Sequence, residues 1–275
     1  MTQPPNFGLI VIGDEILSGK RADKHLPKVI ELLGARGLQL SWAEYVGDQR
    51  GRITEMLRRA FSSQDQVFCC GGIGATPDDH TRQCAAAALG VRLIAHRQAQ
   101  DLIRERMQDL AREKGEVFEP ERADNLQRLQ MGVLPEGAAI VPNPYNKIPG
   151  FSCKGAGGAV VYFAPGFPVM AWPMIEWALE RDCARWFHQR PQRERSVVLY
   201  QAMESQLVPL MEQIEAEHWG VKVFSLPSVD HPVHGAHIEL GVKGTPEAVE
   251  GAWRALWAAL QKMGAASGPQ VLRDR

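Results

Sequence analysis

Residue types that could carry chemistry gather in one glycine-rich segment, residues 70–81 (CGGIGATPDDHT). The segment follows an apolar run and precedes an alanine-rich run, which is the position where open α/β sheets bind ligands. Glycines let the backbone approach a ligand closely, and N–H groups at a helix start favour an anion such as phosphate. No Gly-Lys-Ser/Thr follows, and Pro77 stands where a dinucleotide fingerprint has its third glycine. We therefore predict a phosphate-binding loop that belongs to neither of these two types.

The same segment contains two neighbouring carboxylates, Asp78 and Asp79. They would repel a bare phosphate unless a divalent cation lay between, and carboxylate and phosphate oxygens together suit Mg²⁺. We therefore predict that Asp78 and Asp79 bind Mg²⁺ or another divalent metal. The alternative is structural: Asp78 would be the N-cap of the following helix, and Asp79 would be a first-turn charge that favours the helix dipole.

Further polar residues follow two other predicted strands. Asp14, Glu15 and Ser18 come after the first strand, and Asp48 comes after the second. Because parallel strands end at the same edge of a sheet, these side chains can line the crevice next to the glycine-rich loop. The alternative is that they form polar turns and helix caps.

Three histidines at regular spacing, His231, His234 and His237, suggest a second metal site beside Asp230. Strand-like alternation would send His234 and His237 to opposite faces, and neither a cysteine nor a Glu-bearing helix completes a zinc pattern. We therefore do not predict a metal site here.

The elements that position the candidate residues alternate between strand and helix through the first two thirds of the chain. Apolar runs predict strands at residues 7–12, 39–46, 66–70, 138–141 and 159–164. Helical spacing predicts helices between the early strands, two helices within residues 98–130, and a long final helix that ends near residue 188. Residues 142–150 are too rich in proline and asparagine for regular structure. Repeated strand–helix units predict a three-layer α/β/α domain with a mainly parallel sheet over residues 1–188.

The last third of the chain has a different pattern. Residues 189–195 (QRPQRER) are polar, charged and interrupted by a proline, so we predict a linker. From residue 196 to 275 the predicted order is β-α-β-β-α, with a further edge strand at residues 270–273. This order predicts a small α+β domain of the ferredoxin-like type.

Composition excludes several classes of protein. Of 275 residues 45% are hydrophobic, and 31 Lys and Arg balance 32 Asp and Glu, which argues against a nucleic-acid partner. No apolar stretch approaches the ~20 residues that span a bilayer, and the first five residues lack the basic start of a signal peptide. The five cysteines form no Cys-x-x-Cys pair, which is typical of reduced, buried thiols. We therefore expect a cytoplasmic protein with neither a membrane nor a nucleic-acid partner.

Four segments together resemble the molybdopterin-binding domain of molybdenum-cofactor biosynthesis proteins. They are GDEILSG at residues 13–19, VGD at 46–48, GGIGATPDDHT at 71–81 and APGFP at 164–168. The resemblance covers about residues 7–180 and is strongest to the N-terminal half of competence/damage-inducible protein A. It implies a three-layer α/β fold that binds a pterin or a nucleotide through phosphate groups. Some members of the family adenylylate molybdopterin, and some are proposed to hydrolyse the pyrophosphate of ADP-ribose.

Transferred residue by residue, the resemblance supports roles for the segments already chosen and adds Asn143 and the Pro165–Gly166 turn. We predict that Asp48 and Asp79 are catalytic, and that Asp78 and Asp79 hold the metal. The predicted substrate- and phosphate-binding residues are Asp14, Glu15, Ser18, Gly71, Gly72, Gly74, Thr76, Thr81, Asn143, Pro165 and Gly166. The expected ligand is molybdopterin or an adenine nucleotide, with Mg²⁺ as the metal.

The chain departs from the competence-type pattern at four places around the expected pocket. They are Ala75 for a proline, Lys24-His25 for Thr-Asn, Asn146-Lys147 for Gly-Thr and Val169 for a glutamate. Two hypotheses follow from these differences. The protein is either an enzyme that acts on a phosphoanhydride, or a non-catalytic ligand-binding or assembly module that retains the fold. The small domain also matches that family, and we expect no counterpart of its C-terminal deamidase domain.

The tryptophans predict self-association. Five of the seven recur at helical spacing, namely Trp172, Trp177, Trp186, Trp253 and Trp257. They supply more aromatic surface than two small cores readily absorb, and aromatic residues are enriched in interfaces. We expect a homo-oligomer, a dimer or trimer as in the related families, with an edge strand of the small domain as a contact. The alternative is that these rings pack the helices onto their own sheets.

Overall fold

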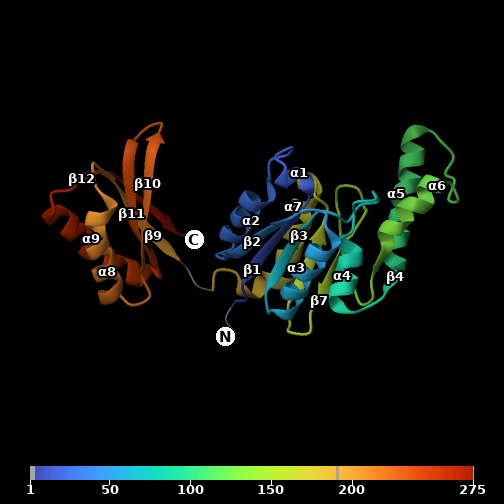
Figure 1. The fold of residues 1–275 in the computed structure, drawn as a ribbon, viewed down its shortest axis with the longest axis horizontal. Coiled ribbons are helices and arrows are strands. Elements are labelled where there is room, and N and C mark those ends of the chain that lie inside the picture. Colours follow the sequence, from blue (N-terminus) through green and yellow to red (C-terminus); the bar gives the residue numbers. More distant parts are fainter. Residues whose placement is uncertain (1–3, 190–191, 275) are drawn as a thin grey trace. The chain divides into compact units, whose positions relative to one another are not determined.

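The computed structural model of the protein describes residues 4–189 and 192–274 (Figure 1). The chain forms two compact units, one from residues up to 34 with 38–187, and one from residues 35–37 with those from 188 onward. Residues 1–3, where no signal peptide was expected, and residues 190–191, inside the predicted linker, lie outside the described residues.

A six-stranded sheet forms the centre of the first unit, in the order β2-β1-β3-β8-β7-β6. Its strands are β1 (Phe7–Ile12), β2 (Leu40–Val46), β3 (Gln66–Cys70), β6 (Ala139–Val141), β7 (Gly150–Lys154) and β8 (Val160–Ala164). The first four strands of the order are parallel, whereas β7 runs antiparallel to both of its neighbours. The prediction of a mainly parallel sheet is confirmed.

Helices cover both faces of this sheet. The helices α2 (His25–Gly34) and α7 (Pro168–Ala178) pack on one face, and α3 (Arg50–Ser62) and α4 (Thr81–Leu89) pack on the other. Strand β1 contributes to both cores, because Leu9 and Val11 face α2 and α7 whereas Ile10 and Ile12 face α3 and α4. A strand buried on both faces reads as a continuous apolar run, which is why the sequence revealed it. The three-layer α/β/α class is confirmed.

An insertion between α4 and β6 contains two strands that the sequence analysis missed. It comprises β4 (Leu93–Ala95), α5 (Arg97–Lys114), α6 (Ala123–Leu129), a 3₁₀ turn (Gln130–Gly132) and β5 (Val133–Pro135). Strands β4 and β5 pair as a separate antiparallel ladder of three residues each, too short for a period-two pattern to appear. In Figure 1 the helices and β4 lie together beside α4.

Two further segments differ from prediction. Strand β7 begins inside the proline-rich segment and has no β-branched residue, so propensity did not indicate it. The predicted long last helix of this unit is regular only to Ala178 and continues as a π turn (Leu179–Cys183) and a 3₁₀ turn (Ala184–Trp186).

The second unit contains a four-stranded antiparallel sheet in the order β10-β11-β9-β12. Its elements are β9 (Arg193–Tyr200), α8 (Glu204–Glu217), β10 (Lys222–His231), β11 (Gly235–Gly244), α9 (Pro246–Lys262) and β12 (Ala266–Asp274). Both helices pack against apolar residues of the sheet, with Leu199, Leu240 and Leu256 fully buried. The ferredoxin-like class, including the added edge strand, is confirmed. Strand β9 begins three residues earlier than the predicted domain start at 196.

The tryptophans do not support the premise of the oligomer prediction. Trp172 and Trp177 of α7 are partly buried and pack against the core that α2 and α7 form with the sheet, and Trp186 is buried in the same core. Trp253 is buried in the second unit and stacks on Trp257, with ring centroids 6.0 Å apart. These rings pack onto their own sheets because each helix buries its apolar face locally. The oligomeric state itself stays a prediction.

Two whole-chain expectations can be compared with the structure. All five cysteines are buried and unpaired, as predicted for reduced thiols. Among residues 4–189 and 192–274, every helix is too short or too polar to cross a bilayer.

Candidate functional site

One edge of the central sheet gathers every segment in which site residues were predicted. Strands β1, β2, β3 and β8 are parallel, so the segments that follow them leave from the same edge. Two antiparallel steps bring the end of β6 to that edge as well. Ligands of open α/β sheets bind at this carboxyl edge. Sequence positions from 13 to 166 therefore converge on one region.

The glycine-rich loop after β3 has a backbone that requires glycine at two positions. Gly71 and Gly72 have φ values of 113° and 67°, which other residues rarely adopt. A Cβ at Gly72 would overlap the Thr81 hydroxyl. Thr81 is fully buried, and its hydroxyl donates to the Gly71 carbonyl at 3.0 Å while its N–H donates to the Gly72 carbonyl at 3.0 Å. Thr81 therefore holds the loop in shape, a structural task that its predicted ligand role did not include.

The acidic end of the loop folds back on Thr76. The Thr76 N–H donates to Asp79 Oδ2 at 2.8 Å, and the Thr76 hydroxyl lies 2.5 Å from Asp78 Oδ1 and 2.5 Å from Asp79 Oδ2. One hydroxyl has one proton, so it can donate to only one of these carboxylates at a time. The hydrogen bond from Thr76 lowers the pKa of the Asp78 carboxyl, which keeps it ionised.

The structural alternative for the two carboxylates is wrong. Helix α4 begins at Thr81 with His80 at the N-cap position, so Asp78 and Asp79 lie in the loop before the helix. His80 makes no side-chain cap hydrogen bond. The first helical residue is set by the bond of Thr81 to Gly72, which sequence patterns do not reveal.

The side chain of Arg82 stabilises the glycine-rich loop, a role that the sequence analysis did not predict. Its side chain is buried and donates to the carbonyl of Gly74 at 2.7 Å and to the carbonyl of Gln130. Burial lowers the pKa of the guanidinium, and the charge of Asp79 opposes that change. The sequence feature that could have indicated this role is a single basic residue, Arg82, in the first turn of an otherwise alanine-rich helix.

Asp14 and Asp48 link the loops after β1 and β2. The Asp14 N–H donates to Asp48 Oδ2 at 3.0 Å, and the Asp48 N–H donates to Asp14 Oδ1 at 3.2 Å. Burial raises the pKa of the Asp48 carboxyl, and the Asp14 N–H bond opposes this. The charges of Asp14, Glu15 and Asp78 raise it further. Carboxylates from three loops therefore influence one another at this edge. Asp14 and Asp48 each accept an N–H group of the other's loop, whereas α1 and α3 have no side-chain cap hydrogen bond, so the local turn and helix caps of the structural alternative are not formed.

The other residue predicted after β1, Ser18, is exposed and closes the short helix α1 (Asp14–Leu17). Its N–H donates to the Asp14 carbonyl at 2.8 Å. Glu15 lies instead beside a pocket of about 280 Å³, which Gly166 also lines. Three more polar side chains line this pocket, Arg21, Lys24 and His25, and the sequence analysis assigned no site role to them.

The loop after β6 is held by Asn143, which is buried. Its amide group donates to Asn146 Oδ1 at 2.8 Å and to the Ile148 carbonyl at 2.9 Å, and its Oδ1 accepts from the Tyr145 N–H at 3.1 Å. The predicted ligand-binding amide is thus occupied by its own loop. The segment is irregular as predicted but contains many internal hydrogen bonds.

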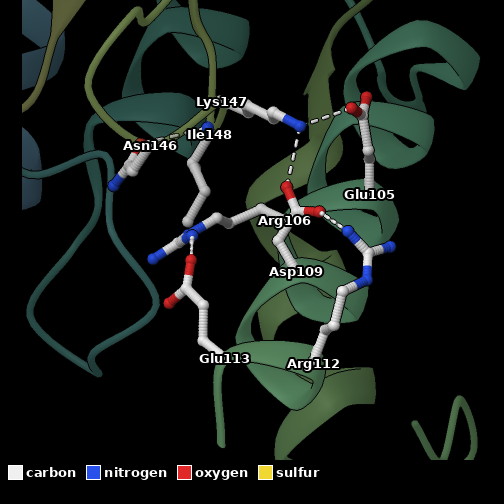
Figure 2. Close-up of polar contacts among 8 residues, drawn as sticks. All are labelled: Glu105, Arg106, Asp109, Arg112, Glu113, Asn146, Lys147 and Ile148. Carbon is white, nitrogen blue, oxygen red and sulfur yellow. Dashed lines mark hydrogen bonds and ion pairs between the residues drawn. The ribbon is translucent and has the colours of Figure 1, made fainter.

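Lys147 joins this loop to helix α5 (Figure 2). It has a left-handed φ of 64°, unusual for a residue with a side chain. Its Nζ lies 2.5 Å from Glu105 Oε1 and 2.7 Å from Asp109 Oδ2, and Asp109 also pairs with Arg112. The Lys147 ammonium lowers the pKa of the Asp109 carboxyl and has its own pKa raised in return. A position where the competence-type pattern has threonine is therefore an ionic connection in this protein.

Three histidines of the second unit, His231, His234 and His237, lie together at the turn between β10 and β11. Their ring centroids are 5.0 to 5.6 Å apart, so the expectation that His234 and His237 face opposite sides is wrong. His234 lies in the turn, where strand alternation does not apply. His231 Nδ1 accepts the N–H groups of Val233 and His234. In the part of the chain that the structure describes, no group of three or more His, Cys, Asp or Glu side chains is arranged to hold a metal ion.

A three-layer α/β unit with a glycine-rich loop and convergent carboxylates at the carboxyl edge of its sheet defines a class of ligand-binding domain. The model of the family described as "Probable molybdopterin binding domain" matches residues 8–185, so the chain belongs to that family.

Individual relatives agree with this assignment. A CinA-like protein of Anaeromyxobacter dehalogenans is 32% identical over 178 residues, which are 64% of this chain but 41% of that protein. The chain thus spans about two fifths of that relative. A Pyrobaculum calidifontis protein is 28% identical over 262 residues, 94% of each chain. The crystal structure of CinA from Thermoplasma acidophilum superposes with a TM-score of 0.54 at 28% identity, covering 64% of this chain and 98% of that one.

Proposed function

We propose that the first unit binds a phosphorylated pterin or adenine nucleotide, with phosphate groups at the backbone of Gly71, Gly72 and Gly74. The observation that carries the proposal is the glycine loop at the end of β3, with two left-handed glycines and a buried Thr81 that holds them. Such a loop turns N–H groups toward an anion. Membership in a family described as molybdopterin-binding supports a ligand of this kind.

The oxygen donors beside the loop fit Mg²⁺. Two carboxylates, Asp78 and Asp79, converge on the Thr76 hydroxyl, which has a single proton to donate. Mg²⁺ is usually bound by one or two carboxylates together with substrate phosphates, so a pair of carboxylates is sufficient. When bound, the ion would supply charge neutralisation at a phosphoanhydride.

The protein's own groups then account for the rest of the chemistry. The loop amides would hold the phosphates, and Arg82 would keep Gly74 in place through its hydrogen bond to the Gly74 carbonyl. Asp48, whose pKa is raised by burial and by neighbouring carboxylates, is suited to accept a proton from a nucleophile and to orient it. Phosphoryl and adenylyl transfer depend chiefly on positioning and charge stabilisation, which suits this site. The reaction class is therefore adenylyl transfer or hydrolysis of an ADP-ribose-type pyrophosphate.

The experiment that tests this proposal combines binding with turnover. Calorimetry and thermal-shift measurements would compare AMP, ATP, ADP-ribose and a pterin phosphate, each with and without Mg²⁺. We expect Asp79→Asn to abolish turnover and the Mg²⁺ dependence of binding while the protein remains folded. Asp101→Asn, on the exposed face of α5, is the control for a lost carboxylate. Normal turnover by Asp79→Asn would refute the catalytic role.

A second candidate function is a non-catalytic ligand-binding or assembly module. Two observations favour it: Val169 stands in place of the glutamate, and Asn143 is occupied by its own loop. This candidate predicts that a ligand binds and raises the melting temperature without being converted. Product analysis after long incubation with Mg²⁺ separates the two functions.

A further inference from the structure

The first two residues of α4 hold three carbonyl groups of the glycine-rich loop. Thr81 binds the carbonyls of Gly71 and Gly72, each at 3.0 Å, through its hydroxyl and its N–H. The Arg82 guanidinium donates to the carbonyl of Gly74 at 2.7 Å. Thr81 and Arg82 are both buried, so these carbonyls point toward the buried start of α4.

The peptide group between Gly74 and Ala75 therefore directs its N–H the other way. The peptide bonds of the described chain are trans, and in a trans peptide the C=O and N–H groups point in opposite directions. Because the Gly74 carbonyl points at Arg82, the Ala75 N–H points away from Arg82 and from the start of α4. Within residues 4–189 and 192–274, this N–H has no acceptor.

The next peptide group is held from both sides. The Ala75 carbonyl accepts from Gln127 Nε2 of α6 at 3.2 Å, and the N–H of the same peptide group, that of Thr76, donates to Asp79 Oδ2 at 2.8 Å. With Arg82 on the preceding carbonyl, both peptide groups that flank the Ala75 Cα have a fixed direction. The Ala75 N–H is thus oriented by the protein but not used by it, although backbone donors are normally paired.

The place of Ala75 in the loop indicates which chemical group this N–H meets. Its neighbour Thr76 contacts both carboxylates of the loop, Asp78 and Asp79, and a Cβ at Gly74 would lie 2.6 Å from Asp79 Oδ2. The Ala75 N–H therefore lies at the acidic end of the loop, next to the two carboxylates. Carboxylates repel a bare anion, so a donor here suits a phosphate oxygen that is bound together with a divalent cation.

We propose that the Ala75 N–H is a ligand-binding donor that holds an oxygen of the phosphate group nearest the two carboxylates, and that Arg82 and Gln127 are the positioning residues that direct it. The proposal rests on the proposed function, because it assigns one further donor to the same phosphorylated ligand. Proline, which stands at this position in the competence-type pattern, has no N–H. The donor is therefore a feature in which this chain differs from that pattern.

The test removes the N–H and keeps the rest of the loop. Ala75→Pro has no N–H, whereas the matched control Ala75→Ser changes the side chain and retains the N–H. Calorimetry with Mg²⁺ would measure the binding of inorganic pyrophosphate, AMP and ADP-ribose to both variants and to the wild type. We expect Ala75→Pro to bind these phosphates about tenfold or more weakly than Ala75→Ser, because a hydrogen bond to a charged oxygen is lost.

A second variant tests the positioning role. Gln127 is exposed, so Gln127→Ala leaves the hydrophobic core intact. We expect this change to weaken pyrophosphate binding about threefold in the wild type, and to lose most of that effect in a chain that already carries Ala75→Pro. Equal weakening of both chains, or of neither, would show that Gln127 does not act through Ala75.

The outcomes distinguish this inference from the proposed function. Equal affinities of Ala75→Pro and Ala75→Ser for phosphates that the wild type binds would overturn the role of the N–H and leave the proposed function intact. A wild-type protein that binds none of these phosphates would overturn both.

A direct readout on the wild type keeps the test independent of folding. Circular dichroism and melting curves would establish that each variant is folded. The Ala75 amide signal of the ¹⁵N-labelled wild type should move downfield and exchange more slowly with water when pyrophosphate and Mg²⁺ bind. An Ala75 amide that keeps its shift and its exchange rate at saturation would contradict the proposal, even if Ala75→Pro failed to fold.

Discussion

Thr81 and Asn143 illustrate how single residues serve this site. Each is buried, and each uses its polar side-chain atoms on the backbone of its own loop. Loops that must expose N–H groups to a ligand need their remaining backbone groups satisfied from within. Predicted ligand residues can therefore be essential for binding without touching the ligand.

The first prediction concerns Gly72. Gly72→Ala forces a Cβ onto a left-handed position and against the buried Thr81 hydroxyl. Gly90→Ala is the matched control, because Gly90 has a φ of 69° with open space around it. We expect Gly90→Ala to cost about 1–2 kcal/mol of unfolding free energy, and Gly72→Ala to cost more. Urea denaturation measures both, and equal losses would show that Thr81 moves aside at no cost.

The second prediction uses the opposite pKa shifts of two carboxylates. Burial and neighbouring charge raise the pKa of Asp48, so folding loses stability from this group as the pH rises above its unfolded value of 3.8. Thr76 lowers the pKa of Asp78, so Asp78 contributes stability above 3.8 that is lost as the pH falls through its folded value. Asp48→Asn should therefore gain stability relative to the wild type toward neutral pH, and Asp78→Asn should lose it.

Urea unfolding midpoints at several pH values between about 4 and 7 would test this pair of variants. The difference for Asp48→Asn should shrink as the pH falls toward 3.8, whereas the difference for Asp78→Asn should persist over this range, because the Asp78 carboxyl becomes protonated only below 3.8. Differences of the same sign at neutral pH would show that the two carboxyls do not experience opposite environments.

At the scale of elements, the loop after β6 and helix α5 are linked by Lys147. The connection is exposed and ionic, and it joins parts of the chain about forty residues apart in sequence. The left-handed backbone of Lys147 would suit glycine better, so the side chain is retained against a conformational preference. This implies that the ion pairs with Glu105 and Asp109 are the stabilising contribution of Lys147.

The third prediction follows from this connection. Both Lys147→Gly and Lys147→Ala remove the two ion pairs. Glycine adopts the left-handed backbone conformation at this position without strain, whereas alanine keeps the unfavourable φ. We expect faster amide exchange in residues 143–149 for both variants, with Lys147→Ala the less stable of the two. Arg97→Ala, which removes a longer, exposed pair with Asp101 on the same helix, is the control. If neither variant changes amide exchange in this loop, at high or at low salt, the role assigned to Lys147 is contradicted.

At the scale of the whole molecule, each unit has a hydrophobic core of its own, and each sheet has open edges. The edge strands β10 and β12 contain Pro227 and Pro269, residues that cannot donate a ladder hydrogen bond. Prolines on edge strands hinder sheet-to-sheet pairing. The exposed Trp219, with 95% of its surface accessible, is a better candidate for an intermolecular contact than the tryptophans first considered.

The fourth prediction is that the chain forms a homo-oligomer through the second unit and that Trp219 contributes to it. Light scattering coupled to gel filtration would measure the mass over a tenfold concentration range. Trp219→Ser should shift the protein toward monomer, whereas Trp257→Phe, which changes a ring packed on its own core, should not. A single species with the monomer mass of 30.5 kDa at every concentration would contradict the prediction.

The sequence by itself determined the layered architecture of both units and the place of the glycine loop. Strands β1, β3 and β8 are buried on both faces, so nearly all of their residues are apolar; the buried Gln66 at the start of β3 accepts a hydrogen bond from the Tyr162 hydroxyl of β8. The helices between them must be amphipathic because each covers one face of a sheet. The glycines after β3 follow from backbone conformations that other residues avoid. These are local requirements, and a sequence displays them directly.

The tertiary structure alone decided which polar groups meet. Asp14 bonds to Asp48 across 34 positions, Arg82 supports Gly74 and Gln130, and the His25 ring bonds to Gly166 across 141 positions. The start of α4 at Thr81 and the proximity of His234 to His237 likewise depend on turns and partners. The physical reason is that such contacts are set by how layers pack and where loops return, and neither propensity nor periodicity encodes a distance between segments far apart in the chain.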